Sequence, residues 1–373
     1  MKIGFDAKRM FNNFTGLGNY SRFVLDTLLE ADTTNNYYLY TPKIKDRPET
    51  KKYLQDTRLN IITPPSWMKT SPLAAVWRST LPMHAKYFSS LDVYHGLSHE
   101  LPVGMPGHIK SIVTIHDLIF LRYPQFYARF DVMMHHQKVK HACKVADRII
   151  AVSEQTAKDV VHFLKADPAK IKVIYQGCHR QFRNKHTAEE IAVVKEKYGL
   201  PERYILMVGS IEARKNAITL LKAFSMLPKD GRPGLVLVGK GTTYLDKVKT
   251  SIAELSIEKE VTLIHQAAFS DLPAIYQGAR VFAYPSLFEG FGIPIIEAIE
   301  SGIPVLTSKG SCFAEAGGLQ AWYADPQQPQ EWTACLKEIL ESDNPQRIAS
   351  QHEHVLKFRP ENNRENLLNS YLF

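Results

Sequence analysis

The chain has 373 residues, of which 45% are hydrophobic and 23% are charged, and its formal net charge is +8. This length allows two domains that each bury a core, and the composition excludes a disordered or fibrous chain. No run approaches the roughly 20 apolar residues of a membrane-spanning helix, and the first residues lack the long apolar core of a signal peptide.

Apolar strands alternate with helices through the first half of the chain. The periodicity predicts, in order, a strand at residues 1–6, a helix at 18–30, strands at 109–117 and 147–153, a helix at 154–164 and a strand at 170–177. Ser153 is the expected N-cap of the helix at 154–164, because its hydroxyl can accept a backbone hydrogen bond there.

The alternation restarts in the second half, after a polar stretch. It predicts helices at 187–198, 217–227, 244–255, 271–278 and 330–341, and strands at 204–210, 234–241, 260–266, 280–286 and 303–308. Apolar strands separated by helices indicate parallel sheets that helices cover on both faces. The sequence therefore predicts an α/β protein with two doubly wound domains joined near residue 180 and a cleft between them. Ligands of such sheets bind beyond the carboxyl ends of the strands.

The segment PSLFEGFGIPIIEA, residues 285–298, joins a predicted strand to a helix. Pro294 suits the first turn of that helix, because proline lacks the amide hydrogen that would be unpaired there. Gly292 therefore lies where a loop meets a helix N-terminus, a place suited to a phosphate. Glu289 precedes the helix and Glu297 lies one turn inside it, so the two carboxylates flank an anion site. A sugar diphosphate fits this layout; helix caps with incidental glutamates are the alternative.

Other loops that follow strands carry cations, a histidine and glycines. Arg214 and Lys215 follow a predicted strand, where two cations could neutralise a departing diphosphate. His116 lies at the end of another strand and would hydrogen-bond a sugar or a reacting group, with a buried structural histidine as the alternative. Gly16 and Gly18 lie ahead of a helix and permit close approach of the backbone to an anion.

Two nucleotide-binding motifs and a metal clamp are missing from the sequence. The loop around Gly18 has Ser21 in place of a third glycine, which argues against a dinucleotide fingerprint. Residues 234–240 match the glycine and lysine spacing of a P-loop, but Gly241 follows where Ser or Thr is needed. Neither an Asp-x-Asp pair nor a CxxC pair occurs, so we expect no metal site. The scattered cysteines also predict a reducing compartment.

The chain resembles, over essentially its whole length, the retaining glycosyltransferases of family 4, also called glycosyl transferases group 1. Glu289 and Glu297, with Phe291 and Gly292 between them, match the family's E-x7-E motif. The resemblance is carried by the segments TGLGNYSRFV, DVYHGLSHELP, VTIHDLIFLRYP, ADRIIAVSEQTAKDV, KVIYQG, GSIEARKNAITLLKAF and PSLFEGFGIPIIEAIESGIPVLTS.

The resemblance implies the GT-B fold, with two Rossmann-like domains that face each other across a cleft. It implies an acceptor-binding domain at residues 1–180, a nucleotide-sugar-binding domain at 181–355, and a crossover helix at 356–373 that packs on the first domain. The only small molecule implied beside the acceptor is a nucleotide diphosphate sugar, with no cofactor and no metal.

The same resemblance implies roles for individual residues. Glu289 would contact the donor sugar, and Glu297 would contact the ribose hydroxyls. Arg214 and Lys215 would bind the diphosphate, and His116 would lie beside the transferred sugar.

The donor loops also show a departure from the family. Backbone contacts to sugar and diphosphate are implied for Phe291, Gly292 and Ile293. Ser210 stands where many members have an arginine, and Arg214 resembles its substitute in a branch that carries an E-P-R-K-N sequence. Many mannosyltransferases belong to that branch, which favours GDP-mannose as the donor, with a UDP-sugar as the alternative.

The resemblance implies metal-independent transfer with retained anomeric configuration, to a glycan or lipid-linked acceptor. Residues 1–180 carry 25 Lys and Arg against 15 Asp and Glu, which suits an anionic surface or is an ordinary solvated face. Residues 64–82 mix Trp67 and Trp77 with Lys69 and Arg78, as at a membrane edge, although packing on the core explains the aromatic residues equally well. We expect a cytoplasmic, peripherally membrane-associated enzyme of surface polysaccharide or lipopolysaccharide synthesis.

Two other classes remain open at this point. A nucleotide-sugar epimerase has the same architecture, but it needs additional acid and base groups facing the sugar. A non-catalytic glycan-binding protein would have lost Glu289 or Lys215, and both are present. Nucleic acid is not an expected partner.

Overall fold

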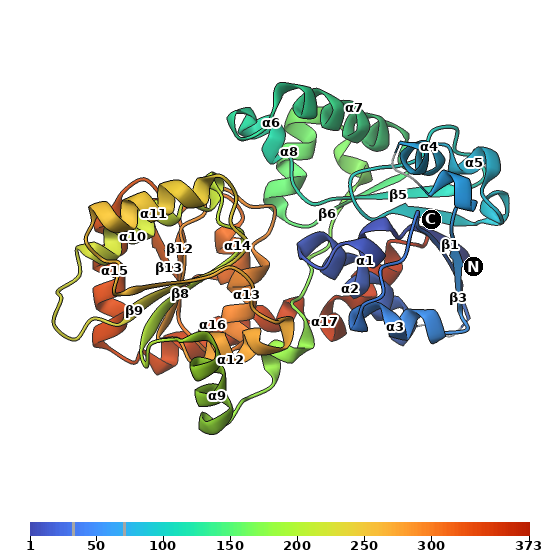
Figure 1. Ribbon diagram of the computed structural model, residues 1–373. Coiled ribbons are helices and arrows are strands. Elements are labelled where there is room, and N and C mark those ends of the chain that lie inside the picture. The colour runs from blue at the N-terminus through green and yellow to red at the C-terminus, as the bar shows by residue number, and fades with distance from the viewer. Residues whose placement is uncertain (32–33, 70–71) are drawn as a thin grey trace. The chain divides into compact units, whose positions relative to one another are not determined.

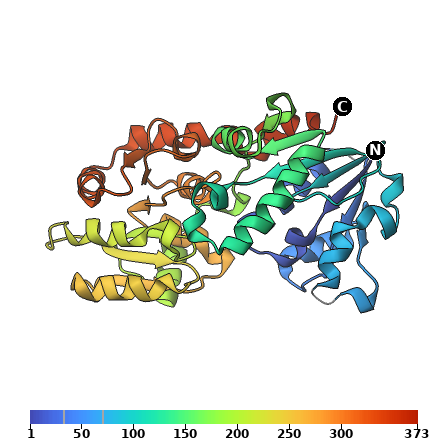
Figure 2. The ribbon, with the colours of Figure 1, turned by 90° about the horizontal axis from the view of Figure 1, so that it is seen from above.

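The computed structural model describes residues 1–31, 34–69 and 72–373, and these form two compact units (Figure 1). Unit 1 comprises residues 1–176 and 360–373, and unit 2 comprises residues 177–359. The chain thus leaves unit 1 after Gln176 and returns to it after Arg359. Figures 1 and 2 both show the C-terminus in the same unit as the N-terminus.

The centre of unit 1 is a seven-stranded sheet with the strand order β3-β2-β1-β4-β5-β6-β7. Every pair of neighbouring strands is parallel; Phe5, for example, pairs with Leu39 on one side and His95 on the other. The strands are β1 (Lys2–Asp6), β2 (Asn36–Tyr40), β3 (Leu59–Ile62), β4 (Val93–Gly96), β5 (Lys110–Ile115), β6 (Arg148–Ala151) and β7 (Ile171–Val173).

Helices connect these strands. They are α1 (Lys8–Asn12), α2 (Gly16–Ala31), α3 (Pro48–Gln55), α4 (Leu73–Ser79), α5 (Leu81–His84), α6 (Ile119–Arg122), α7 (Arg129–Val145), α8 (Glu154–Leu164) and α17 (Pro360–Asn369). One core joins the sheet to α4, α7 and α8, with Trp77, Val139 and Val160 among its buried members. The last helix, α17, packs against α2.

Unit 2 repeats this architecture with six parallel strands in the order β10-β9-β8-β11-β12-β13. The strands are β8 (Tyr204–Val208), β9 (Gly234–Val238), β10 (Val261–Ile264), β11 (Val281–Tyr284), β12 (Val305–Ser308) and β13 (Trp322–Ala324). The order reverses direction between β8 and β11, and ligands of doubly wound sheets bind at the carboxyl ends of the strands at such a switch point.

The helices of unit 2 form two groups around the sheet (Figure 1). The first group, which shares a core with the sheet through Leu220, Val248 and Trp332, consists of α10 (Ala217–Ser225), α11 (Tyr244–Glu254) and α15 (Pro329–Glu341). The helices of the second group, linked to one another by contacts, are α9 (Ala188–Tyr198), α12 (Leu272–Gln277), α13 (Ile293–Glu300), α14 (Phe313–Gly317) and α16 (Pro345–Val355).

Capping explains why two helices begin where the sequence predicts. Ser153 accepts a hydrogen bond from the amide of Thr156, which starts α8 at the expected residue. Thr187 and Glu190 form a reciprocal capping box at the start of α9, and Gly199 ends that helix in the left-handed conformation. The predicted fold class is confirmed, since each unit is a doubly wound parallel sheet. The cleft predicted between the domains stays a prediction.

Candidate active site

Two loops meet at the switch point of unit 2. The loop after β8 contains a short 3-10 helix, Ala213–Lys215, and the loop after β11 begins at Pro285. The amide of Leu287 donates to the carbonyl of Arg214 at 2.9 Å, and the side chain of Asn216 donates to the carbonyl of Pro285 at 3.1 Å. These bonds hold the two loops together, so the side chains that follow β8 are fixed relative to those that follow β11.

A buried cluster of charges occupies this junction. Lys215 Nζ lies 2.6 Å from Glu289 Oε1, and Arg214 Nη1 lies 2.7 Å from the same oxygen. The hydroxyl groups of Ser286 and Tyr284 also donate to Glu289 Oε1, at 2.6 and 3.0 Å. The structure thus brings together the three charged residues that the sequence analysis selected from separate segments.

The surroundings set the charge states of this cluster. Burial by itself would raise the pKa of Glu289, but the positive charges of Arg214 and Lys215, with hydrogen bonds from Lys215 and Ser286, lower that pKa to about 2. Burial lowers the pKa of Lys215, and Glu289 opposes this effect. Glu289 is therefore ionised at neutral pH, with the side chains of Arg214 and Lys215 held next to it.

Three partners that sequence reasoning did not select hold the cations in place. Glu212 accepts from Arg214 Nη2 at 2.7 Å, and the carbonyl of Phe288 accepts from Nη1 at 2.7 Å. Tyr284 accepts a hydrogen bond from Lys215 Nζ. Glu212 and Tyr284 lie within five residues of the predicted site in sequence, but only the folded loops show that they contact it.

Gly292 forms the junction between the loop and helix α13. It is the N-cap of α13 with φ +99°, a conformation that a residue with a Cβ rarely adopts. A Cβ at this position would also lie 3.2 Å from Ile295 Cδ1. The predicted position of Pro294 in the first turn of the helix is confirmed, and Ile293 is the first residue of that helix. The backbone contacts of Phe291, Gly292 and Ile293 to the donor stay a prediction. Phe291 is buried and packs edge-on against Phe358, with ring centroids 5.1 Å apart, so its side chain is part of the core.

Glu297, the second carboxylate of the motif, lies in a different environment from Glu289. It is buried inside α13, and the hydroxyl of Tyr276 donates to its Oε2 at 2.9 Å. Burial raises its pKa to about 7, and the Tyr276 hydrogen bond offsets only part of that shift. One motif therefore contains a carboxylate that is ionised across the physiological range and another that titrates near neutrality.

Ser210 lies between β8 and the cationic residues. Its carbonyl accepts the amide of Glu212 at 3.0 Å, which turns the loop toward Arg214. The backbone that follows the neighbouring strand β9 lies very close to this loop. A Cβ on Gly239 would be only 1.8 Å from the carbonyl oxygen of Gly209. This contact explains Gly239 by backbone packing, whereas Gly209 has φ +146°, a conformation that residues with a Cβ rarely adopt. A role for Ser210 in binding the donor stays a prediction.

His116 belongs to unit 1, at the carboxyl end of β5. Its side chain is buried and packs edge-on against Tyr20, with centroids 4.6 Å apart, and its Nε2 bonds to the carbonyl of Leu97 at 2.9 Å. A carbonyl only accepts, so Nε2 carries the proton and Nδ1 of the neutral ring is an acceptor. Burial lowers the pKa of His116 to about 3, and the ring is neutral at pH 7. Its contact with the transferred sugar stays a prediction.

The predicted position of Gly16 and Gly18 ahead of the helix is wrong, because α2 begins at Gly16 and contains both. The amide of Gly18 donates to the side chain of Asn13 at 3.2 Å, and a Cβ on Gly18 would lie 1.7 Å from the Asn13 carbonyl oxygen. Close packing within unit 1 therefore explains Gly18. A Cβ on Gly16 would meet nothing within 4 Å.

The aromatic segment of unit 1 divides into a buried part and an exposed part. Trp77 is in the core, and Arg78 pairs with Asp6 at 2.7 Å, so both belong to the packed interior. Trp67 is 67% exposed and Lys69 is also exposed. Residues 70–71 of this segment lie outside the described residues. No helix in the described parts of the chain is long and apolar enough to cross a membrane, and contact with a membrane surface stays a prediction.

Among the described residues, no group of three or more His, Cys, Asp or Glu side chains is placed so that it could hold a metal ion. The four cysteines are free thiols, and three of them are buried. The independence from metal stays a prediction that an activity assay must test.

Comparison with known families covers both units. The family model described as Glycosyltransferase Family 4 matches residues 24–182, and the model described as Glycosyl transferases group 1 matches residues 190–354. The chain is 25% identical to O-antigen chain mannosyltransferase B of Escherichia coli over 388 aligned positions, which span 100% of this chain and 99% of that protein. It is 27% identical to O-antigen chain mannosyltransferase RfbU of Salmonella typhimurium over 67% of this chain and 65% of that protein.

Solved structures share the fold. Anabaena HepE in complex with UDP and glucose superposes with a TM-score of 0.73 and 18% identity, with 99% of both chains covered. WaaG, a glycosyltransferase involved in lipopolysaccharide biosynthesis, gives a TM-score of 0.72 and 14% identity, with 100% of both chains covered. At these identities the likeness establishes the two-domain GT-B architecture.

Proposed function

Since this chain belongs to the glycosyl transferases group 1, with a family 4 module at its N-terminal side, we propose that it transfers mannose from GDP-mannose to a glycan or lipid-linked acceptor. The product would be part of a surface polysaccharide such as an O-antigen. Full-length similarity to an O-antigen mannosyltransferase supports the choice of sugar and pathway. The observation that carries the proposal is the cluster of Arg214, Lys215 and Glu289 at the switch point of unit 2.

The cluster suits a departing diphosphate. The Lys215 ammonium has three N–H donors, and Tyr284 and Glu289 take two of them, which leaves one for a phosphate oxygen. Arg214 is held by Glu212 and Phe288, so its guanidinium is oriented before a ligand arrives. Fixed cations in a buried site stabilise developing negative charge more strongly than solvated cations do. This arrangement supports metal-independent catalysis, with the two side chains in place of a metal ion.

The proposed reaction retains the anomeric configuration. The bond from the anomeric carbon of mannose to the diphosphate oxygen breaks, and a bond from the same carbon to the acceptor oxygen forms on the same face. The proton of the acceptor hydroxyl passes to the departing diphosphate oxygen. Glu289 is fixed in ion pairs on Oε1, which suits it to orient a sugar hydroxyl rather than to attack carbon. Glu297 would accept hydrogen bonds from the ribose.

The same proposal places the enzyme in the cytoplasm, peripherally on the membrane. A lipid-linked acceptor would be presented at that surface, and the positive charge excess of residues 1–180 would favour an anionic leaflet. Nucleic acid is not proposed as a partner.

A transfer assay tests the function. The purified chain is incubated with GDP-mannose and a lipid-tagged mannose oligosaccharide, with and without EDTA, and the product is identified by mass spectrometry. We expect addition of one or more mannose units that EDTA does not abolish, and a one-bond C1–H1 coupling in NMR that identifies the retained configuration. Transfer only from a UDP-sugar would overturn the donor, and an inverted linkage would overturn the mechanism.

A further inference from the structure

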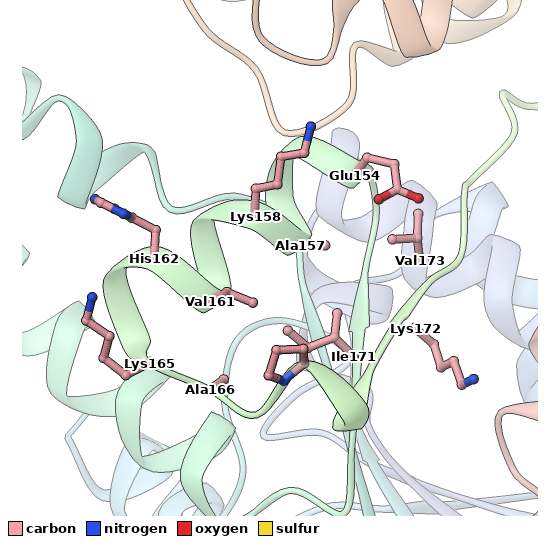
Figure 3. Close-up of a pocket in the computed structure, with 11 residues that line it drawn as sticks. Glu154, Ala157, Lys158, Val161, His162, Lys165, Ala166, Ile171, Lys172 and Val173 are labelled. Carbon is pink, nitrogen blue, oxygen red and sulfur yellow. The ribbon is translucent and has the colours of Figure 1, made fainter.

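Unit 1 has a groove that contains none of the residues assigned above (Figure 3). It has a volume of about 1000 Å³ and lies between helix α8, the turn that follows it and the edge strand β7. All of its lining residues lie between Glu154 and Val173, so one short stretch of sequence builds it.

The lining of the groove combines hydrocarbon with positive charge. Val161, Ala166, Pro168 and Ile171 provide apolar surface. Basic side chains line both walls of the groove. The wall formed by α8 and the turn after it provides Lys158, His162 and Lys165, and β7 provides Lys172. Figure 3 shows Lys158, His162 and Lys165 extending outward from α8, while Val161 and Ile171 lie nearer the middle of the groove.

The three lysines are available to a ligand. Each is exposed, and within the described part of the chain none of them forms an ion pair. Glu154 is the one carboxylate among the lining residues and lies at the end where α8 begins. A site with three lysines, a histidine and one glutamate attracts an anion, and its apolar surface also favours a hydrocarbon chain.

The position of the groove fits a long ligand. Helix α8 has 11 residues, which corresponds to a length of about 16 Å at 1.5 Å per residue. Glu154 and Val173 lie at the carboxyl ends of β6 and β7, the edge where doubly wound sheets bind ligands, whereas Lys165 and Pro168 lie at the opposite end. A ligand in the groove would therefore lead from the ligand-binding edge of the sheet along the side of unit 1.

From this combination we propose that the groove binds a prenyl phosphate or diphosphate, the carrier end of a lipid-linked acceptor. The phosphate lies among the lysines and His162, the hydrocarbon covers Val161, Ile171 and Pro168, and the attached glycan extends past Glu154 toward the carboxyl edge of the sheet. This inference rests on the proposed function for the identity of the acceptor, but the binding it predicts needs neither donor nor turnover.

Calorimetric titration of the full chain with farnesyl phosphate tests the site. Farnesol and inorganic phosphate serve as separate probes for the hydrocarbon and the anion. We expect farnesyl phosphate to bind at least about tenfold more tightly than either, because only it engages both kinds of surface. Equal binding of farnesol or of inorganic phosphate would overturn the proposal. Binding to anionic phospholipid vesicles without binding to farnesyl phosphate would also overturn it, in favour of a general membrane contact.

Variants locate the site. Lys158→Glu combined with Lys172→Glu should weaken farnesyl phosphate binding by at least about tenfold, because two attractive charges become repulsive. The matched control is Lys140→Glu combined with Lys144→Glu on α7, which makes the same change in net charge at exposed positions outside the groove. Val161→Thr keeps the shape and should weaken binding by about threefold through the lost methyl group. An equal loss in the control would overturn the assignment to the groove.

Stabilisation of unit 2 by GDP, measured on the same samples, separates this inference from the proposed function. Retained GDP binding with no farnesyl phosphate binding would refute the groove alone. Farnesyl phosphate binding in the groove with no binding of any nucleotide would support the site and refute the transferase.

Discussion

Lys215 and Glu289 are 74 residues apart in sequence, and their charged groups meet at 2.6 Å in the interior of unit 2. The pair joins the loop after β8 to the loop after β11, the two strands at which the sheet order reverses. This buried contact therefore contributes to charge neutralisation, to the geometry of the two loops and to the candidate donor site, together with the Arg214–Glu289 pair. Each variant of this pair should affect stability and transfer together.

The two partners are not equivalent, which gives a first prediction. Glu289→Gln leaves Lys215 and Arg214 without their shared anion and should cost about 3–5 kcal/mol of unfolding free energy. Lys215→Met should cost less, because Arg214 still pairs with Glu289 at 2.7 Å. Both should lower the rate of transfer by about 100-fold or more. Urea unfolding and initial rates on the same samples measure this; near-normal rates in both variants would refute the site.

Glu297 should make unit 2 sensitive to pH. Its folded pKa, raised to about 7 by burial, exceeds the ordinary carboxyl value, so the folded state binds more protons between the two values. Stability from this group is fully present below about pH 4.5 and is lost as pH rises through 7, by about 3 kcal/mol in all. Glu297→Gln should remove this loss. Unfolding free energies of both proteins at pH 5.5 and 8 measure it, and parallel pH profiles would contradict the account.

Nucleotide affinity should change in the opposite direction with pH. A ribose hydroxyl donates more strongly to a carboxylate than to a neutral carboxyl, so binding of GDP should tighten as pH rises through about 7. Glu297→Gln should bind more weakly and show no such dependence near neutrality. Titration calorimetry at several pH values checks both statements, and an unchanged pH dependence in the variant would assign the effect to another group.

The stability of unit 1 should fall in acid, whereas the contribution of Glu297 to the stability of unit 2 rises in acid. Burial lowers the pKa values of His95, His99 and His116 to about 3, 4 and 3. Because these folded pKa values are lowered, the histidines stabilise unit 1 at pH values above the ordinary histidine pKa. This stability is lost as pH falls below about 6.5. Hydrogen exchange at pH 7.5 and 5, corrected for the intrinsic rate, should therefore show weaker protection at pH 5 in unit 1 peptides. Uniform changes in both units would contradict this expectation.

Glu300, the last residue of helix α13 in the candidate donor site, interacts with Arg183 near the start of unit 2 and with Arg359 at its end. Its buried carboxylate binds Arg359 through two bonds of 2.7 and 2.8 Å and lies 3.6 Å from Arg183 Nε. Glu300→Gln should therefore cost about 3–5 kcal/mol. Asp343→Asn, which removes an exposed ion pair with Arg280, is the control and should change stability by less than about 1 kcal/mol. Equal effects in the two variants would show that burial of Glu300 does not matter.

A matched pair of glycines tests the corrected interpretation of α2. Gly18→Ala should destabilise unit 1 strongly, because its Cβ would collide with the Asn13 carbonyl. Gly16→Ala should be neutral or stabilise the helix by up to about 1 kcal/mol. Thermal unfolding distinguishes the two variants. A loss of activity in a stable Gly16→Ala protein would restore the interpretation of Gly16 as a ligand contact.

The sequence was sufficient for features that local rules determine. Strong apolar strands, the Ser153 cap and the Thr187 helix start follow from periodicity and capping, and these elements appear where expected. The motif with Glu289 and Glu297 also places both residues correctly around the start of α13. The shared position of Arg214, Lys215 and Glu289 follows from the rule that parallel strands present their carboxyl ends at one edge.

Other features depend on contacts between distant segments. No local pattern shows that Tyr276 contacts Glu297, or that burial separates the pKa values of the two motif carboxylates. Gly18 has the sequence appearance of a ligand loop, but its close neighbour is the Asn13 carbonyl. The groove beside α8 needs the edge position of β7, and strand order cannot be read from periodicity alone.

Nucleotide binding to unit 2 is the central claim, and thermal unfolding with GDP, UDP, ADP and dTDP in the presence of EDTA tests it most directly. At 100 times its dissociation constant, a ligand of the folded state should add about 2.7 kcal/mol. We predict that GDP stabilises the chain selectively and that Lys215→Met, compared with its own unliganded state, loses most of this effect. Stabilisation by no nucleotide, or equal stabilisation of the Lys215→Met variant, would contradict the assignment of the donor site.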